Sequence, residues 1–315
     1  MSSTQGPTNA SPPRPLHGVF PVFQTPYHDD ESIDFTTLEK EINWLFDRGS
    51  NGIVMAMVSE VLRLSSDERE QLAEQACRFA KGRGAAIISV GAESCHTAER
   101  YARHAESVGA DALMAIPPVS IGAMESEVLR YYERLLRAVK IPVVVQDASG
   151  YVGRPMDVSL LAKILNEFGD RVLFKPEATP IGPRLSALRD ATNGKAKVFE
   201  GTGGIALVDS YRRGIIGTMP GADLIDGLVA LWKALEAGDD KRIYRLSLPI
   251  SAVIAVQNSL DAFLAIEKYL LVKQGVFRNT IVRGPVGFTL DDETRKEVDR
   301  LFDVLQNVLR EESGS

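Results

Sequence analysis

The residues with the clearest chemical potential lie in the segment Val172–Thr179, which reads VLFKPEAT. Its apolar run is typical of a buried strand, and it is followed by Lys175 and, two residues later, by Glu177. Because side chains alternate between the two faces of a strand, we expect these two side chains on the same face. Burial disfavours the charged form of an amine, and a neutral amine can attack a carbonyl to form a Schiff base. The alternative is a lysine that only extends its charged end out of a core strand.

The composition is that of an ordinary globular protein and excludes several classes of function. The chain has 315 residues, of which 44% are hydrophobic and 25% are charged, and its formal net charge is -6. Lysine and arginine are spread along the chain, which argues against nucleic acid as a main partner. No apolar run approaches the ~18 residues that a membrane-spanning helix needs. Cys77 and Cys95 have neither a metal-binding nor a disulfide spacing and fit a reducing compartment, so we expect a cytoplasmic protein.

The first residues differ in composition from the rest of the chain. Residues 1–15 are rich in Ser, Thr, Gly, Asn and Pro, and they lack the apolar stretch of a signal peptide. Such a segment is too polar to pack, so we predict a disordered tail over 1–15. We expect residues 16–315 to form a single catalytic domain.

From Leu16 onward, strand-like apolar runs alternate eight times with helical patterns over roughly 220 residues. Asp34 can cap the first helix, and Ser65 with Glu68 has the spacing of a capping box at the start of the second. Strands are predicted at 17–27, 53–58, 86–90, 112–116, 141–146, 172–177, 197–200 and 215–219, and helices at 35–47, from 65 onward, and at 98–108, 125–139, 157–168, 183–191, 205–212 and 224–237.

This alternation predicts a (β/α)8 barrel, or TIM barrel, with extra C-terminal helices from about residue 239. A doubly wound open sheet is the competing fold, but no GxGxxG motif follows the first strand and no P-loop motif occurs. In a TIM barrel the chemistry lies at the C-terminal ends of the strands. The residues at these strand ends are Gln24, Thr25, Ser59, Glu60, 93–96, Val119, Ser120, Gln146, Asp147, Lys175, Glu177, 200–204 and 218–221. They lack the His/Asp/Glu ligand set of a metal site, so no bound metal is expected.

Five short motifs follow one another along the chain: GVFPVFQTPY at 18–27, SEVLRLSSDER at 59–69, ADALMAIPP at 110–118, FKPEAT at 174–179 and RGP at 283–285. Taken in this order, they resemble the dihydrodipicolinate synthase/N-acetylneuraminate lyase family of class I aldolases and lyases. The resemblance runs from about Gly18 to Gly287, so it covers nearly the whole predicted barrel and the helices after it.

The resemblance implies how the site would work. In this family the strand-six lysine forms a Schiff base with pyruvate or another 2-oxo acid, and the matching residue here is Lys175. The loop after strand two, here Val58 and Ser59, would bind the substrate carboxylate, and Glu60 would brace that loop. Because the lysine itself is the reactive group, no cofactor is implied. Family members usually form dimers or tetramers, so a homo-oligomer is expected.

Several positions depart from the synthases of the family. Met57 stands where they carry threonine, and Val119 and Gln146 stand where they carry tyrosines. Tyr151 aligns with the arginine that holds the second substrate's carboxylate. Methionine and valine cannot transfer protons, and glutamine is a poor acid or base, so the resemblance argues against the reaction with aspartate semialdehyde. The combination of SE after strand two with VQDA at strand five is instead similar to dehydratases of 2-keto-3-deoxy sugar acids, such as 2-keto-3-deoxyarabonate.

We therefore expect a Schiff-base lyase that acts on a 2-oxo acid, with dehydration of a 2-keto-3-deoxy sugar acid as its reaction. Two alternatives stay open: a synthase or aldolase with an altered proton relay, and a non-catalytic barrel that binds pyruvate or a sugar acid. Glu177 and Gln146 are expected to be catalytic together with Lys175. Substrate-binding residues are expected at Val58, Ser59, Ser120, Asp147, Tyr151, Gly201 and Thr218.

Overall fold

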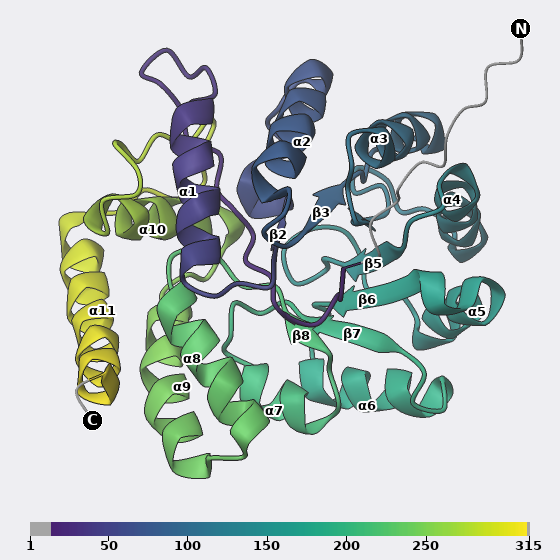
Figure 1. The fold of residues 1–315 in the computed structure, drawn as a ribbon. Helices are drawn as coiled ribbons and strands as arrows, with labels where there is room; N and C mark the ends of the chain where they lie inside the picture. The colour runs from purple at the N-terminus through teal and green to yellow at the C-terminus, as the bar shows by residue number, and fades with distance from the viewer. Residues whose placement is uncertain (1–13, 314–315) are drawn as a thin grey trace, which may run out of the picture.

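The computed structural model describes residues 14–313, and its centre is a barrel of parallel strands surrounded by helices (Figure 1). The 8-stranded sheet has the order β1-β8-β7-β6-β5-β4-β3-β2, and every pair within it is parallel. The strands are β1 (Gly18–Val19), β2 (Gly52–Val54), β3 (Ala85–Ser89), β4 (Ala112–Ala115), β5 (Val143–Asp147), β6 (Val172–Pro176), β7 (Lys197–Glu200) and β8 (Gly217–Thr218).

The barrel closes between the segment after β1 and strand β2. Val22 forms a parallel bridge with Val54 on one side and with Gly221 on the other. The Phe23 N–H donates to the Val54 carbonyl at 3.1 Å, and the Val54 N–H donates to the Pro21 carbonyl at 2.9 Å. The predicted TIM barrel is therefore confirmed.

The inside of the barrel is filled with side chains, as expected for this fold. The rings of Phe20 and Phe199 meet edge to face with their centroids 5.3 Å apart. Gly52 and Gly217 leave room for these rings, because a Cβ atom there would lie 2.3 Å from the Phe20 ring and 2.5 Å from the Phe199 ring, respectively. The barrel axis is therefore packed, and free space is confined to its ends.

The helices of the barrel cover its outer surface and begin where the sequence predicts capping. The Asp34 side chain accepts a hydrogen bond from the Thr37 N–H, and Ser65 and Glu68 form a reciprocal capping box. Both predicted caps are confirmed. The helices are α1 (Phe35–Asp47), α2 (Ser66–Ala80), α3 (Cys95–Ser107), α4 (Glu125–Ala138), α5 (Val158–Phe168), α6 (Ile181–Ala191), α7 (Leu207–Arg212) and α8 (Ile225–Ala237).

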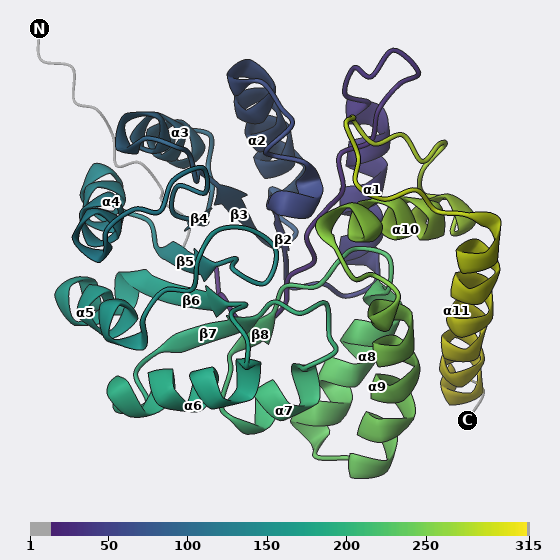
Figure 2. The same ribbon diagram turned by 180° about the vertical axis from the view of Figure 1, so that it is seen from behind.

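Three more helices follow the barrel: α9 (Asp240–Ala255), α10 (Leu260–Lys273) and α11 (Asp292–Ser313). Helices α9 and α11 pack against each other and against α8, whereas α10 crosses to the side of α1 (Figure 2). No single helix within residues 14–313 is long and apolar enough to cross a membrane by itself; α9 and α10 meet that test only as a pair bent by 118°.

The prediction was wrong for two element boundaries near the site. The predicted strand 53–58 stops at Val54, and Met57–Ser59 forms a single 3-10 turn, η1. The predicted strand 17–27 contains only β1 and isolated bridges at Val22 and Tyr27. Pro21, which directly precedes Val22, has no N–H to donate to a ladder.

The predicted tail, residues 1–15, falls mostly outside the described residues. Only residues 14 and 15 of this tail are described. Arg14 donates to the Gly84 carbonyl, and its guanidinium lies 3.4 Å from the Asp111 carboxylate. The boundary at residue 15 stays a prediction.

Candidate active site

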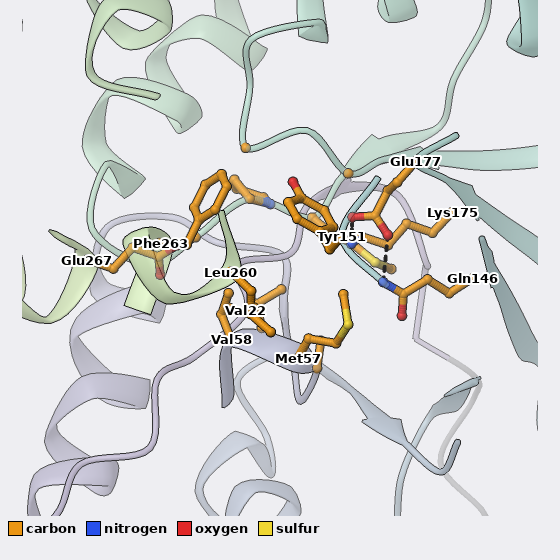
Figure 3. A pocket seen from close by; sticks show the side chains of 16 residues that line it. Val22, Met57, Val58, Gln146, Tyr151, Lys175, Glu177, Leu260, Phe263 and Glu267 are labelled. Atoms are coloured by element: carbon orange, nitrogen blue, oxygen red, sulfur yellow. Dashed lines mark hydrogen bonds and ion pairs between the residues drawn. The ribbon is translucent and has the colours of Figure 1, made fainter. Parts of the chain in front are cut away.

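A pocket of about 420 Å³ opens at the C-terminal ends of the strands (Figure 3). Its lining comes from β5 and β6, from the loops after β2, β7 and β8, and from helix α10. The lining residues are Val22, Ala56, Met57, Val58, Gln146, Tyr151, Lys175, Glu177, Gly201, Gly203, Met219, Pro220, Gly221, Leu260, Phe263 and Glu267.

Lys175 and Glu177 meet inside this pocket. Strand β6 holds Lys175, and the Glu177 N–H extends the ladder by donating to the Asp147 carbonyl at 2.8 Å. Their side chains therefore share a face, with 2.8 Å between Lys175 Nζ and Glu177 Oε1. Both side chains are almost fully buried, at 5% and 2% exposure. The prediction that they point the same way is confirmed.

Gln146 completes this group from the neighbouring strand. Gln146 on β5 pairs in register with Lys175 on β6, and its Nε2 donates to Glu177 Oε2 at 2.6 Å (Figure 3). The Glu177 carboxyl thus has a cation on one oxygen and an amide donor on the other. Burial raises the pKa of Glu177, and the charge of Lys175 and the hydrogen bond from Gln146 act in the opposite direction.

The loop after β2 brings Met57 and Val58 to the pocket wall, as predicted for Val58. These are the first two residues of η1, and the first N–H groups of a helix have no partner within it. Ser59 lies differently from its prediction. Its hydroxyl donates to the Phe23 carbonyl at 2.6 Å and accepts from the Ala56 N–H at 3.1 Å, so it is used within the loop and does not line the pocket.

Glu60 braces this loop, as predicted. Its carboxylate receives Lys268 Nζ at 2.5 Å and the Arg283 N–H at 3.1 Å, and its side chain is fully buried. Its backbone is left-handed, with a φ of 57°, a conformation that non-glycine residues seldom adopt. The chain therefore turns sharply at Glu60, and two distant residues hold the turn.

Tyr151 and Gly201, which are predicted to bind substrate, lie in the pocket lining. The loop after β5 folds inward, and the Tyr151 ring packs edge to face on Phe263 at a centroid distance of 5.8 Å. Burial raises the pKa of Tyr151, and nearby carboxyls including Glu177 add to this effect. At Gly201 a Cβ atom would lie 2.8 Å from Lys175 Cε, so a glycine is needed there to leave space for the lysine.

Besides Ser59, three more predicted substrate-binding residues lie outside the pocket lining. Ser120 is exposed and donates to the carboxylate of Glu93. The Asp147 carboxylate accepts from two backbone N–H groups of its own loop, at 3.1 and 2.9 Å, and Thr218 donates to Glu200 at 2.7 Å. Each polar group already serves a local structural bond. Substrate binding by these three residues stays a prediction.

Helix α10 supplies a wall of the pocket that the sequence analysis missed. Leu260, Phe263 and Glu267 stand across the pocket from Lys175 (Figure 3). Glu267 accepts from Gln24 Nε2 at 2.6 Å, and burial raises its pKa well above the usual range. A signal was available, because a single acid inside the apolar run FLAIEKYLL is unusual unless it is buried and bonded.

Within residues 14–313, no three His, Cys, Asp or Glu side chains come together in a way that could hold a metal ion.

Known proteins resemble this chain over nearly its whole length. A sequence profile described as the dihydrodipicolinate synthetase family matches residues 15–304. An L-2-keto-3-deoxyarabonate dehydratase of Azospirillum brasilense is 28% identical over 302 residues, which are 92% of this chain and 94% of that one. The crystal structure of a dihydrodipicolinate synthase from Rhodopseudomonas palustris is 27% identical and superposes with a TM-score of 0.83, covering 92% of this chain and 98% of that one.

A second solved structure shares the fold at lower identity. It is the chloride-inhibited dihydrodipicolinate synthase of Acinetobacter baumannii, complexed with pyruvate. It is 23% identical, has a TM-score of 0.82, and covers 92% of this chain and 98% of that one.

Proposed function

Because the chain belongs to the dihydrodipicolinate synthetase family of lyases, we propose that it forms a Schiff base between Lys175 and a 2-oxo acid and dehydrates a 2-keto-3-deoxy sugar acid. The observation that carries this proposal is the contact between the Lys175 amine and the Glu177 carboxyl, 2.8 Å apart inside the pocket. It places a nucleophile and a proton acceptor side by side, which is the arrangement that covalent catalysis needs.

The first step is formation of the imine. Glu177 takes the proton that the Lys175 ammonium must lose, and the free amine attacks the C2 carbonyl of the substrate. One proton of the attacking nitrogen moves to the C2 oxygen and gives the carbinolamine. The proton held by Glu177 then completes the water that leaves, so a protonated imine is formed and Glu177 is again a carboxylate. The Met57 and Val58 N–H groups hold the substrate carboxylate, since oriented backbone donors suit an anion.

The second step is loss of the C4 hydroxyl. The protonated imine draws electrons from C3, and Glu177 takes a proton from that carbon. The resulting enamine expels the C4 hydroxyl, which leaves as water with the proton that Glu177 now carries. Hydrolysis of the conjugated imine frees Lys175, so the balance is one substrate to one unsaturated 2-oxo acid and one water. Gln146 keeps the Glu177 carboxyl in place throughout.

The charges of the pocket support a substrate with a neutral tail. Within the described part of the chain, Lys175 is the single cation among the residues that line the pocket, and Glu177 and Glu267 are its acids. A second substrate carboxylate would find no partner there and would be costly to bury. Hydroxyl groups would find donors and acceptors in Tyr151 and Glu267. A sugar acid fits this lining better than the two-carboxylate adduct of a synthase.

The test is reductive trapping with borohydride. The chain is incubated with pyruvate or with 2-keto-3-deoxy sugar acids, reduced, and analysed by intact mass and peptide mapping. We expect an adduct on Lys175, none in the Lys175→Ala variant, and normal trapping in the control Lys163→Ala, which alters a surface lysine. Loss of water from a sugar acid is then followed by absorbance of the unsaturated product.

The outcomes separate the two parts of the proposal. An adduct without dehydration of any sugar acid would retain the Schiff base and refute the dehydratase reaction. Absence of any adduct would refute both and would favour a barrel that only binds 2-oxo acids.

A further inference from the structure

The loop from Ala56 to Glu60, which forms one wall of the pocket, is held from two sides. On the barrel side, two hydroxyls tie it to the segment after β1. Thr25 Oγ1 donates to the Ser59 carbonyl at 2.6 Å, and Ser59 Oγ donates to the Phe23 carbonyl at 2.6 Å. These bonds are local to the barrel.

On the other side, the loop is tied to the C-terminal segment by a buried ion pair. Lys268 of α10 donates to Glu60 at 2.5 Å and to the Ile281 carbonyl at 2.6 Å. The two side chains are 1% and 0% exposed. Glu60 also accepts from the Arg283 N–H at 3.1 Å. A buried pair of this kind contributes little net stability compared with apolar packing, which favours a geometric role over a stabilising one.

A second set of contacts runs parallel to this ion pair. Two cations lie over the Tyr27 ring. Lys268 Nζ is 4.6 Å and the Arg283 guanidinium carbon 4.7 Å from the ring centroid. Arg63, just after the loop, contacts Asp261 of α10 at 2.5 Å. The loop after β1, the loop after β2 and the C-terminal segment thus meet around one buried lysine.

The residue before Lys268 explains why this contact matters for the pocket. Glu267 lines the pocket, as do Leu260 and Phe263 of the same helix, and Met57 and Val58 line it from the loop. The pair formed by Lys268 and Glu60 therefore joins two neighbouring walls of the pocket. A shift of α10 along its axis would move one wall relative to the other.

We infer that Lys268 is a positioning residue for substrate binding, acting through Glu60 to fix the loop from Ala56 to Glu60 against helix α10. The substrate side of this inference rests on the proposed function. The loop presents the Met57 and Val58 N–H groups to the 2-oxo acid, and the ion pair sets where they stand. Lys268 touches no reacting atom.

The experiment compares Lys268→Met with Lys268→Arg, Glu60→Gln and the double variant Glu60→Gln/Lys268→Met. The matched control is Lys273→Met on the same helix. The Lys273 amine donates to the Asp299 carboxylate at 2.6 Å, and this contact does not involve the loop. Two quantities are measured: hydrogen exchange of the peptide that covers 56–63, and the pyruvate concentration that half-saturates borohydride trapping. Thermal unfolding is recorded for each variant.

For Lys268→Met we expect exchange of the loop peptide to rise at least tenfold, with strands β3 to β6 unchanged, and the half-saturating pyruvate concentration to rise at least tenfold. Lys268→Arg should recover part of both, and Lys273→Met should match the wild type. The double variant leaves no unpaired buried charge, so its unfolding temperature should recover while half-saturation stays high. If Lys268→Met does not fold, Glu60→Gln and Lys268→Arg give the same comparison.

Two results would overturn the inference. One is loop exchange in Lys268→Met equal to that in Lys273→Met. The other is a double variant in which half-saturation recovers together with thermal stability, which is the behaviour of a merely structural pair. Failure of the wild type to trap any 2-oxo acid would refute the proposed function instead, and the exchange data would still decide the role of Lys268.

Discussion

Gln146 on β5 and Glu177 just after β6 are joined across neighbouring strands by a 2.6 Å hydrogen bond from the amide of the first to the carboxyl of the second. This bond opposes the effect of burial on the Glu177 pKa. It also fixes one oxygen of the carboxyl, so that the other faces Lys175. Glutamine, which cannot itself transfer a proton at neutral pH, thus acts here by holding the group that can.

Replacing this glutamine should change the pH dependence of the reaction. In Gln146→Leu the carboxyl loses a donor that lowers its pKa, so the pKa of Glu177 rises further. The form that accepts a proton then requires a higher pH, and the acidic limb of the kcat/KM profile should move to higher pH. We expect kcat to fall roughly 10- to 100-fold. The surface variant Gln71→Leu is the control, and an unchanged profile in Gln146→Leu would contradict the assigned role.

Gly201 should tolerate no side chain. In Gly201→Ala the new Cβ would lie 2.8 Å from Lys175 Cε and 2.9 Å from Glu177 Cγ, so one of these side chains must move. Overpacking of this kind typically costs about 1–3 kcal/mol of unfolding free energy. We expect reductive trapping at Lys175 to fall at least tenfold. The same substitution at Gly227 in α8, away from the pocket, should leave trapping intact, and equal trapping in both variants would count against this geometry.

Tyr151 should matter for the sugar acid and not for pyruvate. Tyr151→Phe retains the ring that packs on Phe263 and removes only the hydroxyl in the pocket. A single hydrogen bond to a substrate hydroxyl contributes about 1 kcal/mol, so kcat/KM for dehydration should fall about fivefold. The pyruvate concentration that half-saturates trapping should not change, because pyruvate has no hydroxylated tail to contact Tyr151. Steady-state kinetics and trapping on one preparation make the comparison, and a loss shared by both substrates would point to disturbed packing.

The stability of the fold should depend on the protonation of Asp223. Burial raises the pKa of this carboxyl from 3.8 to about 7. The folded chain therefore keeps a proton that the unfolded chain has lost, and the resulting stabilisation is present below pH 3.8 and disappears as pH rises through about 7. Asp223→Asn mimics the neutral acid and cannot lose that proton.

We therefore expect the unfolding free energy of the wild type, relative to Asp223→Asn, to decrease between about pH 5 and about pH 8. Urea unfolding of both chains at the two pH values measures this difference. A difference that is the same at both pH values would show that Asp223 does not titrate on unfolding in this range.

Much of the catalytic centre could be predicted because it depends on local periodicity. The two-residue repeat of a strand places Lys175 and Glu177 on one face wherever β6 lies. The alternation of strands and helices predicts the barrel, and the barrel then brings Gln146 next to them. The inward position of Tyr151 is different, because the sequence does not specify how the loop after β5 folds.

The remaining site residues depend on contacts that local patterns do not encode. Ser120, Asp147 and Thr218 each follow a strand end, but their polar groups bind within their own neighbourhood and do not reach the pocket. The turn at Met57–Ser59 is stabilised by hydrogen bonds to the β1 segment, far away in sequence. The contribution of α10 depends on how a helix after the barrel packs, which its own periodicity does not specify.

The pocket is built from two parts of the chain, the eight-stranded barrel and helix α10, which comes after it. The barrel carries the amine and the carboxyl that would make and break the covalent link, and residues 260–267 face them from a segment that comes after all eight strands. Under the proposed function, the substrate tail would meet residues of both parts, Tyr151 of the barrel and Glu267 of α10. Substitutions at the pocket-lining residues of α10 would then alter which tails are accepted while Lys175 and Glu177 stay the same, so the range of substrates could change without loss of the bond-making residues.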